Sequence, residues 1–356
     1  MPLFKDMLGS NETLFKNAVA LDFDFMPKMI PYREQEQHYI AECVKPLFKK
    51  RNGRNLIITG EPGVGKTLAC KHVLDELEEQ TDEIMPVYVN CWQHNTTYKV
   101  MLAFCDALGY KFTQNKKTEE LFVVVKGILN KKSAVFVFDE IDKVEEFDFL
   151  YTLLEEIYRK VVIMITNYKE WASEIDPRIK SRLIPDTLEF KPYKPGEIRG
   201  ILLERRNAAF YDTAWQEDAF DLVTQKTAES GDIRIGLFLL RESGNAAEDE
   251  SKRAITLAHV QKAISRMEGF SIKKDTELET GTQEILALVK AHPDKRIGEL
   301  FKLYQDGGGA ATYKTFQRKI QKLAENKFIS VKKIMGGAEG STTIIGPFQH
   351  KKLTEF

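Results

Sequence analysis

The residues best suited to chemistry lie at positions 60–67, which read Gly-Glu-Pro-Gly-Val-Gly-Lys-Thr. They follow an apolar run at 55–59 and precede a helical pattern that begins at Leu68. In such a loop the glycines let backbone N–H groups cradle phosphate oxygens, Lys66 reaches the β- and γ-phosphates, and Thr67 offers its hydroxyl to Mg²⁺. The sequence therefore predicts binding of a nucleoside triphosphate. The predicted binding residues are Gly60, Glu61, Pro62, Gly63, Val64, Gly65, Lys66, Thr67 and Leu68.

Two carboxylates follow a second apolar run. Residues 134–138 alternate β-branched and aromatic side chains, which predicts a buried parallel strand, and Asp139 and Glu140 come directly after it. Carboxylates at the carboxyl end of a strand lie beside the phosphate loop in sheets of this kind. We expect Asp139 to hold Mg²⁺ together with Thr67, and Glu140 to polarise the attacking water.

A third strand, predicted at 161–165, leads to Asn167, whose amide could orient the water. Farther along, Arg178 and Arg182 are four residues apart on a short helix that begins near Pro177. One of these arginines could project to the γ-phosphate of an adjacent subunit, since a guanidinium contacts two oxygens at once. The alternative is that both are ordinary surface residues.

Composition limits the remaining possibilities. A chain of 356 residues suggests two or three domains, and 43% hydrophobic with 29% charged residues indicates packed cores rather than disorder. The four cysteines are widely spaced without a zinc-binding pattern, which predicts buried thiols in a reducing compartment. We find no signal peptide and no apolar run of about 18 residues, so we expect a cytoplasmic protein without a membrane partner. The cysteines are Cys43, Cys70, Cys91 and Cys105.

Charge is unevenly distributed along the chain. Residues 282–356 hold 13 Lys or Arg and 7 Asp or Glu, a net charge of +6, whereas residues 1–281 carry −7. Residues 271–281 lack apolar periodicity and are predicted to be a linker. The tail after it shows three short helical patterns and two strand-like runs around a glycine-rich hairpin at 335–340, which predicts a winged helix-turn-helix. The helices are expected at 283–291, 297–304 and 312–326, and the strands at 328–334 and 342–345.

The third helix of this tail separates apolar from polar positions. Its polar residues could enter a major groove, and we expect Lys314, Gln317 and Arg318 to read DNA. Lys332 and Lys333 flank the hairpin and are expected to meet phosphates. The alternative is a winged helix used for protein contacts, although the positive charge argues against it.

These motifs, in this order, resemble those of the AAA+ ATPases over roughly residues 25–270. Residues 60–67 look like Walker A, Asp139 and Glu140 like Walker B, and Asn167 like sensor 1; Arg182 looks like the arginine finger and Arg234, in Gly-Asp-Ile-Arg, like sensor 2. The resemblance implies an α/β fold with a parallel-sheet P-loop domain and a helical lid. It also implies that Arg234 touches the γ-phosphate from the lid.

A narrower resemblance rests on residues 31–34 (Pro-Tyr-Arg-Glu), 89–91 (Val-Asn-Cys), 138–142 (Phe-Asp-Glu-Ile-Asp) and 191–193 (Lys-Pro-Tyr). This combination is similar to the archaeal replication initiators, relatives of the eukaryotic origin recognition complex and its helicase-loading partner. The similarity implies that Tyr193 and Arg205 contact the nucleotide, Tyr193 against the adenine. It also places residues 98–115 where these initiators carry a helical insertion that grips DNA. The apolar residues of this stretch are more typical of a protein core.

The expected domains are an AAA+ base at 1–190, whose first ~24 residues are a candidate flexible segment, a lid at 191–270, the linker at 271–281, and the winged helix at 282–356. Together with the nucleotide-binding motifs, this resemblance implies a nucleoid-associated ATPase that hydrolyses ATP slowly, with ATP, ADP and Mg²⁺ as its ligands. The resemblance also implies that it binds double-stranded origin DNA, recruits or loads an MCM-type helicase, and meets other initiator copies on DNA. The alternatives are a transcriptional or plasmid-maintenance regulator and a clamp-loader-like remodeller.

Overall fold

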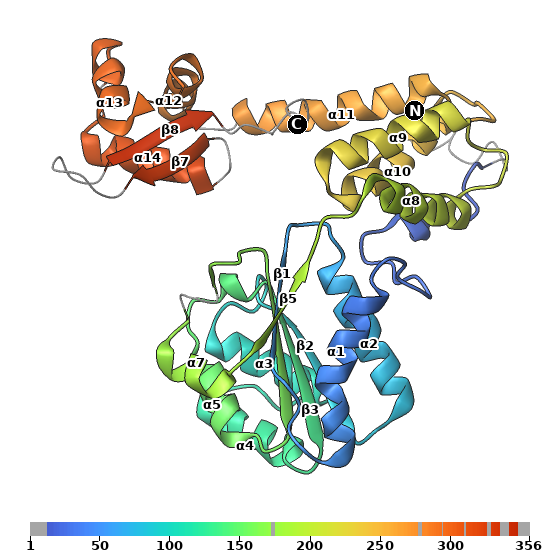
Figure 1. Cartoon of the computed structure of the whole chain (residues 1–356), viewed down its shortest axis with the longest axis vertical. Helices are drawn as coiled ribbons and strands as arrows, with labels where there is room; N and C mark the ends of the chain where they lie inside the picture. The colour runs from blue at the N-terminus through green and yellow to red at the C-terminus, as the bar shows by residue number, and fades with distance from the viewer. Residues whose placement is uncertain are drawn as a thin grey trace. The chain divides into compact units, whose positions relative to one another are not determined.

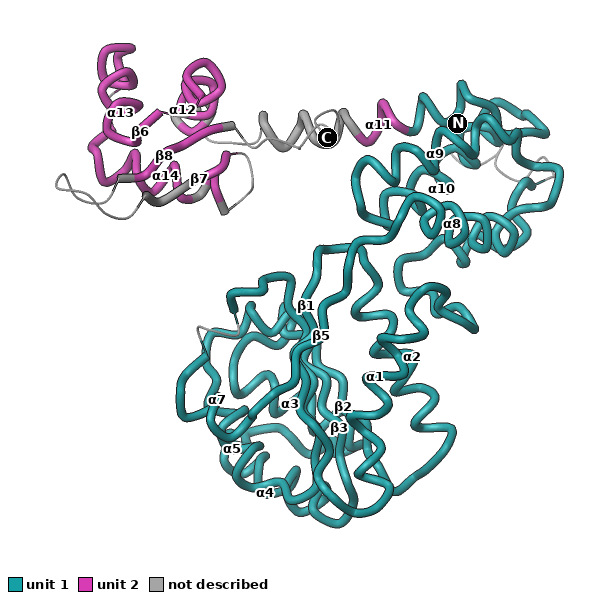
Figure 2. Tube along the Cα trace, in the orientation of Figure 1, with its two compact units in different colours: residues 1–263 teal, residues 264–356 magenta. Residues whose placement is uncertain are grey.

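A computed structural model of the chain describes residues 13–171, 175–276, 280–293, 295–309, 311–325, 329–334 and 342–347. The chain divides into two compact units, residues 1–263 and residues 264–356 (Figure 2). Each unit is described below by itself. Within the described ranges, no helix is both long and apolar enough to span a bilayer.

A five-stranded parallel sheet forms the centre of the first unit (Figure 1). The three predicted strands are confirmed as β1, β3 and β4. The edge strand β5 was not predicted, because its polar and apolar residues alternate without a flanking motif. The order across the sheet is β2-β3-β4-β1-β5, formed by β1 (Leu56–Gly60), β2 (Ile84–Asn90), β3 (Ser133–Asp139), β4 (Lys160–Thr166) and β5 (Asp186–Phe190).

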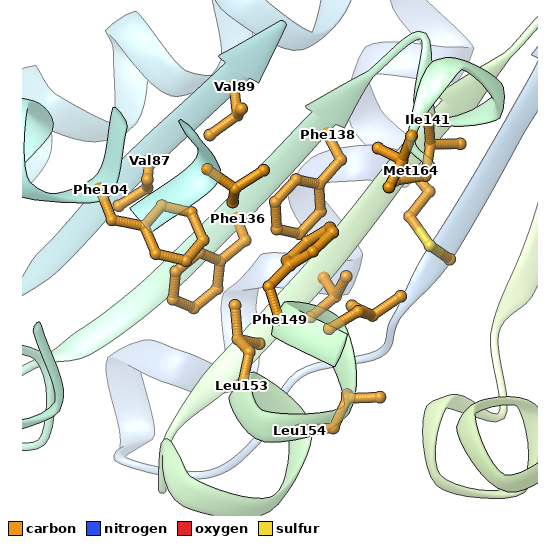
Figure 3. Packing of buried hydrophobic residues seen from close by; sticks show 14 of the residues in the cluster. Val87, Val89, Phe104, Phe136, Phe138, Ile141, Phe149, Leu153, Leu154 and Met164 are labelled. Carbon is orange, nitrogen blue, oxygen red and sulfur yellow. The ribbon is translucent and has the colours of Figure 1, made fainter. Parts of the chain in front are cut away.

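Helices cover both faces of this sheet, so the central strands are apolar on both sides. In β3, Phe136 and Phe138 pack on one face with Phe104 and Phe149 (Figure 3), whereas Val135 and its alternate neighbours pack on the other. The second face is covered by α1 (Glu34–Val44), the 3-10 turn η2 (Lys45–Lys49) and α2 (Lys66–Gln80). The first is covered by α3 (Thr97–Ala107), α4 (Thr118–Leu129), α5 (Asp148–Glu156) and α7 (Pro177–Leu183).

The lid is a helical bundle that follows β5. Its helices α8 (Pro195–Ala209), α9 (Glu217–Ser230) and α10 (Ile233–Asp249) pack against one another, and α11 (Leu257–Thr276) begins after them. The first ~24 residues were expected to be a flexible segment. From residue 13 onward, the chain is instead packed against the lid. The 3-10 turn η1 (Ala18–Leu21) packs on α8 and α10, and Phe15 stacks on Phe210. Ala20 and Leu21 are fully buried there, which fixes this segment to the lid.

The predicted linker at 271–281 is also helical in part. Helix α11 continues to Thr276, and α12 begins at Thr280. Residues 271–276 contain neither Gly nor Pro, so nothing in them breaks a helix. Missing apolar periodicity argues against a packed face, not against helix formation.

The second unit contains the tail predicted to be a winged helix-turn-helix. The described residues of this tail form three helices and an antiparallel sheet of order β6-β8-β7, and the end of α11 precedes them in the unit. A buried cluster that includes Ile285, Leu300 and Phe316 joins the helices to the sheet. The hairpin predicted at 335–340 lies outside the described residues. The elements are α12 (Thr280–Ala291), β6 (Lys295–Arg296), α13 (Ile297–Asp306), α14 (Tyr313–Glu325), β7 (Ile329–Ile334) and β8 (Thr342–Pro347).

Candidate nucleotide site

The loop between β1 and α2 has the backbone shape that its glycines allow. Gly60, Gly63 and Gly65 have φ angles of 151°, 77° and 88°, which lie in the region that side chains disfavour. Space is restricted as well, because a Cβ on Gly63 would lie 2.0 Å from a carboxylate oxygen of Asp232 in the lid. A Cβ on Gly65 would lie 2.7 Å from the Tyr193 hydroxyl. Base and lid thus meet over the loop.

A cavity of about 520 Å³ opens at this point. Its wall combines the loop, the carboxyl ends of β3 and β4, the segment 23–31 and the lid helices. Gly60 and Glu61 shape the loop but do not line the cavity. The sequence-predicted residues that line it are Pro62, Gly63, Val64, Gly65, Lys66, Thr67, Leu68, Asp139, Glu140, Asn167, Tyr193, Arg205 and Arg234.

Lys66 is buried, and its ammonium is fully engaged within the site. The Nζ atom donates to the carbonyls of Gly60 and Glu61 and to the Asn167 Oδ1, each at 2.8 Å. Burial lowers the pKa of Lys66 to about 8, although the Asp139 carboxylate opposes this shift. Asn167 therefore positions the lysine directly, in addition to the water-orienting role expected from sequence.

The Asp139 carboxylate links three segments of the base. Its Oδ2 accepts hydrogen bonds from the Thr67 hydroxyl at 2.6 Å and the Tyr88 hydroxyl at 2.8 Å, and its Oδ1 accepts from the Glu140 N–H. Burial, followed by the Asp139 charge, raises the pKa of Tyr88, so the phenol stays protonated and can donate.

These oxygens fit a magnesium ion. A hydroxyl and a carboxylate within hydrogen-bond distance are the hard oxygen donors that Mg²⁺ prefers. In a site of this kind, phosphates and water would supply the remaining ligands.

Glu140 has an unusual backbone. Its φ and ψ angles of 54° and 44° are left-handed, a conformation that is strained for a residue with a side chain and is typical of functional positions. It precedes the 3-10 turn η3 (Ile141–Lys143). Burial, together with the charges of Asp139 and Asp142, raises the pKa of Glu140. A raised pKa makes this carboxylate a better proton acceptor for water.

From the lid, Arg234 enters the cavity near the first turn of α10. Its guanidinium is held by the Asp232 carboxylate, with the shortest contact 2.6 Å long. Asp232 also caps the helix by accepting from the Arg234 N–H. The Glu140 charge contributes to the raised pKa of Arg234, after the Asp232 hydrogen bond that is its main cause.

Neither candidate finger arginine lies in this cavity. Arg182 forms an ion pair with Glu155 and stacks on Tyr151 at 4.8 Å. Arg178 is held by Asp176 and is 80% exposed. Both arginines therefore lie on the outer surface formed by α5 and α7. An arginine that contacts the nucleotide of another copy would have to be exposed in this way.

The chain can now be compared with known proteins. A family model described as "AAA domain" matches residues 49–168, and one described as "Cdc6 AAA+ ATPase-type lid domain" matches residues 199–265. ORC1-type DNA replication protein 1 of Sulfurisphaera tokodaii is 34% identical over 272 residues, which are 73% of this chain and 68% of that protein. The chain belongs to the family of ORC1-type DNA replication proteins. ORC1-type DNA replication protein 2 of Methanothermobacter thermautotrophicus is 27% identical over 96% of this chain and 94% of its own.

Solved structures agree with the fold of this ORC1-type chain. The Aeropyrum pernix ORC1 protein in complex with DNA matches with a TM-score of 0.74 at 24% identity, covering 95% of this chain and 94% of its own. The Aeropyrum pernix ORC2 protein, solved as ADPNP-ADP complexes, matches with a TM-score of 0.65 at 18% identity, covering 95% of both chains. The predicted AAA+ fold class is confirmed.

Sequence reasoning missed one whole wall of the ORC1-type site. Residues 23–31 line the cavity. Arg205 holds this segment by donating to the Phe25 carbonyl at 3.3 Å, and it donates to the Ala20 carbonyl of the preceding turn η1 at 3.2 Å. Arg205 thus lines the cavity while its guanidinium binds the chain's own backbone. The available signal was the position of this apolar stretch, because Phe23 and Met29 come shortly before the Pro-Tyr-Arg-Glu motif.

Arg33 was also missed. It is 4% exposed, donates from Nε to the Val64 carbonyl and from a terminal nitrogen to the Lys191 carbonyl, and lies 3.9 Å from the ring centroid of Tyr193. One buried guanidinium therefore joins the phosphate loop to the start of the lid. Tyr193 is itself almost fully buried against the loop.

In the second unit, the predicted DNA readers share one face of α14. Lys314, Gln317 and Arg318 are exposed, whereas Phe316 and Ile320 are buried. Lys332 and Lys333 lie on β7, and their side chains are outside the described part of the structure. The helical spacing of this segment therefore separates a core face from a polar face as predicted.

Proposed function

We propose that this ORC1-type protein is an ATP-switched replication initiator. The observation that carries the proposal is the shared cavity, whose wall combines the phosphate loop of the base with Arg234 of the lid. A nucleotide in that cavity contacts both bodies at once, so its phosphate number can change how the lid sits on the base. Membership of the family of ORC1-type DNA replication proteins supports a role in replication.

Hydrolysis of ATP to ADP and phosphate is the chemistry these residues support. Glu140 accepts a proton from the attacking water, and Lys66 and Arg234 neutralise phosphate charge. Asn167 keeps Lys66 aligned through their 2.8 Å hydrogen bond. Thr67 and Asp139 would hold Mg²⁺, which when bound draws negative charge from the phosphate oxygens.

Neither Arg178 nor Arg182 lines the cavity, so we expect slow turnover by a single copy. The three donors of Lys66 and the guanidinium of Arg234 already have protein partners, so each must exchange partners to reach phosphate. The proposed finger, Arg182 or Arg178, must come from a second copy. ATP then acts mainly as a conformational signal.

The proposed partners are duplex origin DNA, an MCM-type helicase and other initiator copies. The DNA proposal is supported by the exposed Lys314, Gln317 and Arg318 and by the net charge of +6 in the tail. It is also supported by the fold shared with an ORC1 protein that was solved in complex with DNA.

Two experiments test this proposal. Glu140→Gln should retain ATP binding and lose hydrolysis; retained hydrolysis would remove Glu140 from the role of base. A genome-wide map of bound DNA should show peaks at replication origins. Peaks confined to promoters would instead support a regulator, and rapid DNA-stimulated hydrolysis by ring-shaped particles would support a remodeller.

A further inference from the structure

Tyr88 contacts the Asp139 carboxylate but does not line the nucleotide cavity. It belongs to the edge strand β2, where it pairs with Val137 of β3, two residues before Asp139. Its ring packs with the core under α2, and the Lys71 Nζ lies 4.7 Å from the ring centroid. The ring is thus fixed on two sides, and only its hydroxyl reaches the site.

Counting lone pairs shows what this hydroxyl does. A carboxylate offers about four acceptor positions. The protein fills three of those on Asp139: two on Oδ2, from Thr67 and Tyr88, and one on Oδ1, from the Glu140 N–H. With Oδ2 held from both sides, the carboxylate has little freedom to rotate.

The fixed Asp139 carboxylate also orients the Thr67 hydroxyl. The proton of this hydroxyl points at Asp139 Oδ2, 2.6 Å away, so its oxygen lone pairs point elsewhere and stay available to a cation. If the carboxylate turned, the hydroxyl would turn with it. The orientation of the one hydroxyl ligand in the loop therefore depends on what holds Asp139.

We propose that Tyr88 is the positioning residue of the cation site, acting through Asp139 on Thr67. This inference rests on the proposed function, since it deepens the assignment of Thr67 and Asp139 to Mg²⁺. Partners of this kind typically change metal affinity by 10- to 100-fold when they are removed. Tyr88 does not line the nucleotide cavity, so it would act through Asp139 and not on the nucleotide directly.

The test measures binding, not turnover. A fluorescent ATP analogue is titrated into full-length protein in EDTA, and Mg²⁺ is then added back in steps. Tyr88→Phe keeps the packed ring, so affinity in EDTA should stay within about twofold of wild type. The Mg²⁺ concentration that gives half of the affinity gain should rise about tenfold.

A matched control is available in the same unit. The Tyr39 hydroxyl donates to Asp186 Oδ2 at 3.0 Å, at the edge strand β5 and away from the loop. Tyr39→Phe therefore removes the same kind of hydrogen bond and should leave the Mg²⁺ titration unchanged. In an Asp139→Asn background, Tyr88→Phe should add no further shift, because the two residues act as one unit.

The outcomes separate the two proposals. A Tyr88→Phe titration that superimposes on wild type, while wild type gains affinity with Mg²⁺, overturns the role of Tyr88 and leaves the cation assignment standing. A shift of equal size for Tyr39→Phe overturns it too, since the effect would then be general. Wild-type affinity that ignores Mg²⁺ overturns the cation assignment itself.

Discussion

Arg234 is held by Asp232, two residues before it, through both its backbone N–H and its guanidinium, with distances of 2.6 to 3.1 Å. Asp176 holds Arg178 in the same way at the start of α7. In both places one carboxylate caps a helix and retains an arginine that is a candidate to contact phosphate: Arg234 by the family resemblance, and Arg178 as the alternative to Arg182. A phosphate must compete with that carboxylate for the guanidinium.

Asp232→Ser should therefore tighten ATP binding. Serine preserves the helix cap, but it removes a negative charge beside the loop and releases Arg234. We expect ATP affinity to rise about threefold to tenfold, the range typical of one exposed charge-assisted hydrogen bond. Nucleotide titration checks this, with Asp176→Ser as the matched control that should leave affinity unchanged. Weaker ATP binding in Asp232→Ser would show that the carboxylate aids the nucleotide instead of competing with it.

Asn167→Asp should weaken ATP binding more than ADP binding. The substitution keeps the side-chain shape but places a carboxylate 2.8 Å from the Lys66 Nζ, at the end of the loop that serves the β- and γ-phosphates. Repulsion of the extra phosphate should lower ATP affinity by about tenfold. Asn167→Ala separates this charge effect from the loss of the amide, and it should change ATP affinity less. Equal losses for ATP and ADP would place Asn167 away from the terminal phosphate.

ATP affinity should fall as pH rises above about 8, the lowered pKa of Lys66. Phosphate favours the charged ammonium, so the pKa of Lys66 is higher in the complex than in the free protein. ATP affinity therefore drops by up to about tenfold per pH unit between these two pKa values.

The pH dependence of folding stability has the opposite sign. The unfolded chain binds more protons than the folded chain between pH 8 and 10.5, so the Lys66 contribution to stability rises with pH in this range. Titrations from pH 7 to 9 check the binding, and Lys66→Arg should flatten the profile. A flat wild-type profile would contradict the role of Lys66.

Much of the nucleotide site at the carboxyl edge of the sheet was predictable from the sequence. Its residues directly follow the strands that position them. Gly60 to Thr67 and Asp139 each adjoin a strand end, and parallel strands bring their carboxyl ends together. The wall formed by residues 23–31 was not predictable in this way. Its contacts join distant positions, as when Arg205 binds the Phe25 carbonyl 180 residues away. Such pairings depend on the packing of the whole unit, which local periodicity does not contain.

Tyr88 shows the same limit within the sheet. Nothing in the sequence around it indicates that its hydroxyl meets Asp139, 51 residues later. Strand order and register decide that contact, because β2 pairs with β3 in parallel. The tail behaves differently, since the buried and exposed faces of α14 follow from helical spacing alone.

Arg33→Met should destabilise the first unit and weaken nucleotide binding together. Methionine fills similar volume but leaves the carbonyls of Val64 and Lys191 without their donor and leaves Glu36 unpaired. Loss of buried partners of this kind costs about 3 kcal/mol. Thermal melting and ATP titration measure the two effects. Arg199→Met is the control, because Arg199 pairs with Glu217 and Asp221 on the lid surface and should matter little.

Arg318→Ala should weaken binding to origin duplex DNA and flatten its salt dependence by about one unit, because each phosphate contact releases about one counterion. Arg318 is exposed on α14, on the side opposite the buried Phe316. Binding measured at several salt concentrations gives the slope, and Arg51→Ala, an exposed arginine of the first unit, serves as the control. Gln317→Ala does not change the charge of the protein. If Gln317 contacts a base, this substitution should alter the sequence preference of DNA binding and leave the salt slope as in wild type. An unchanged slope in Arg318→Ala would remove this arginine from the DNA interface.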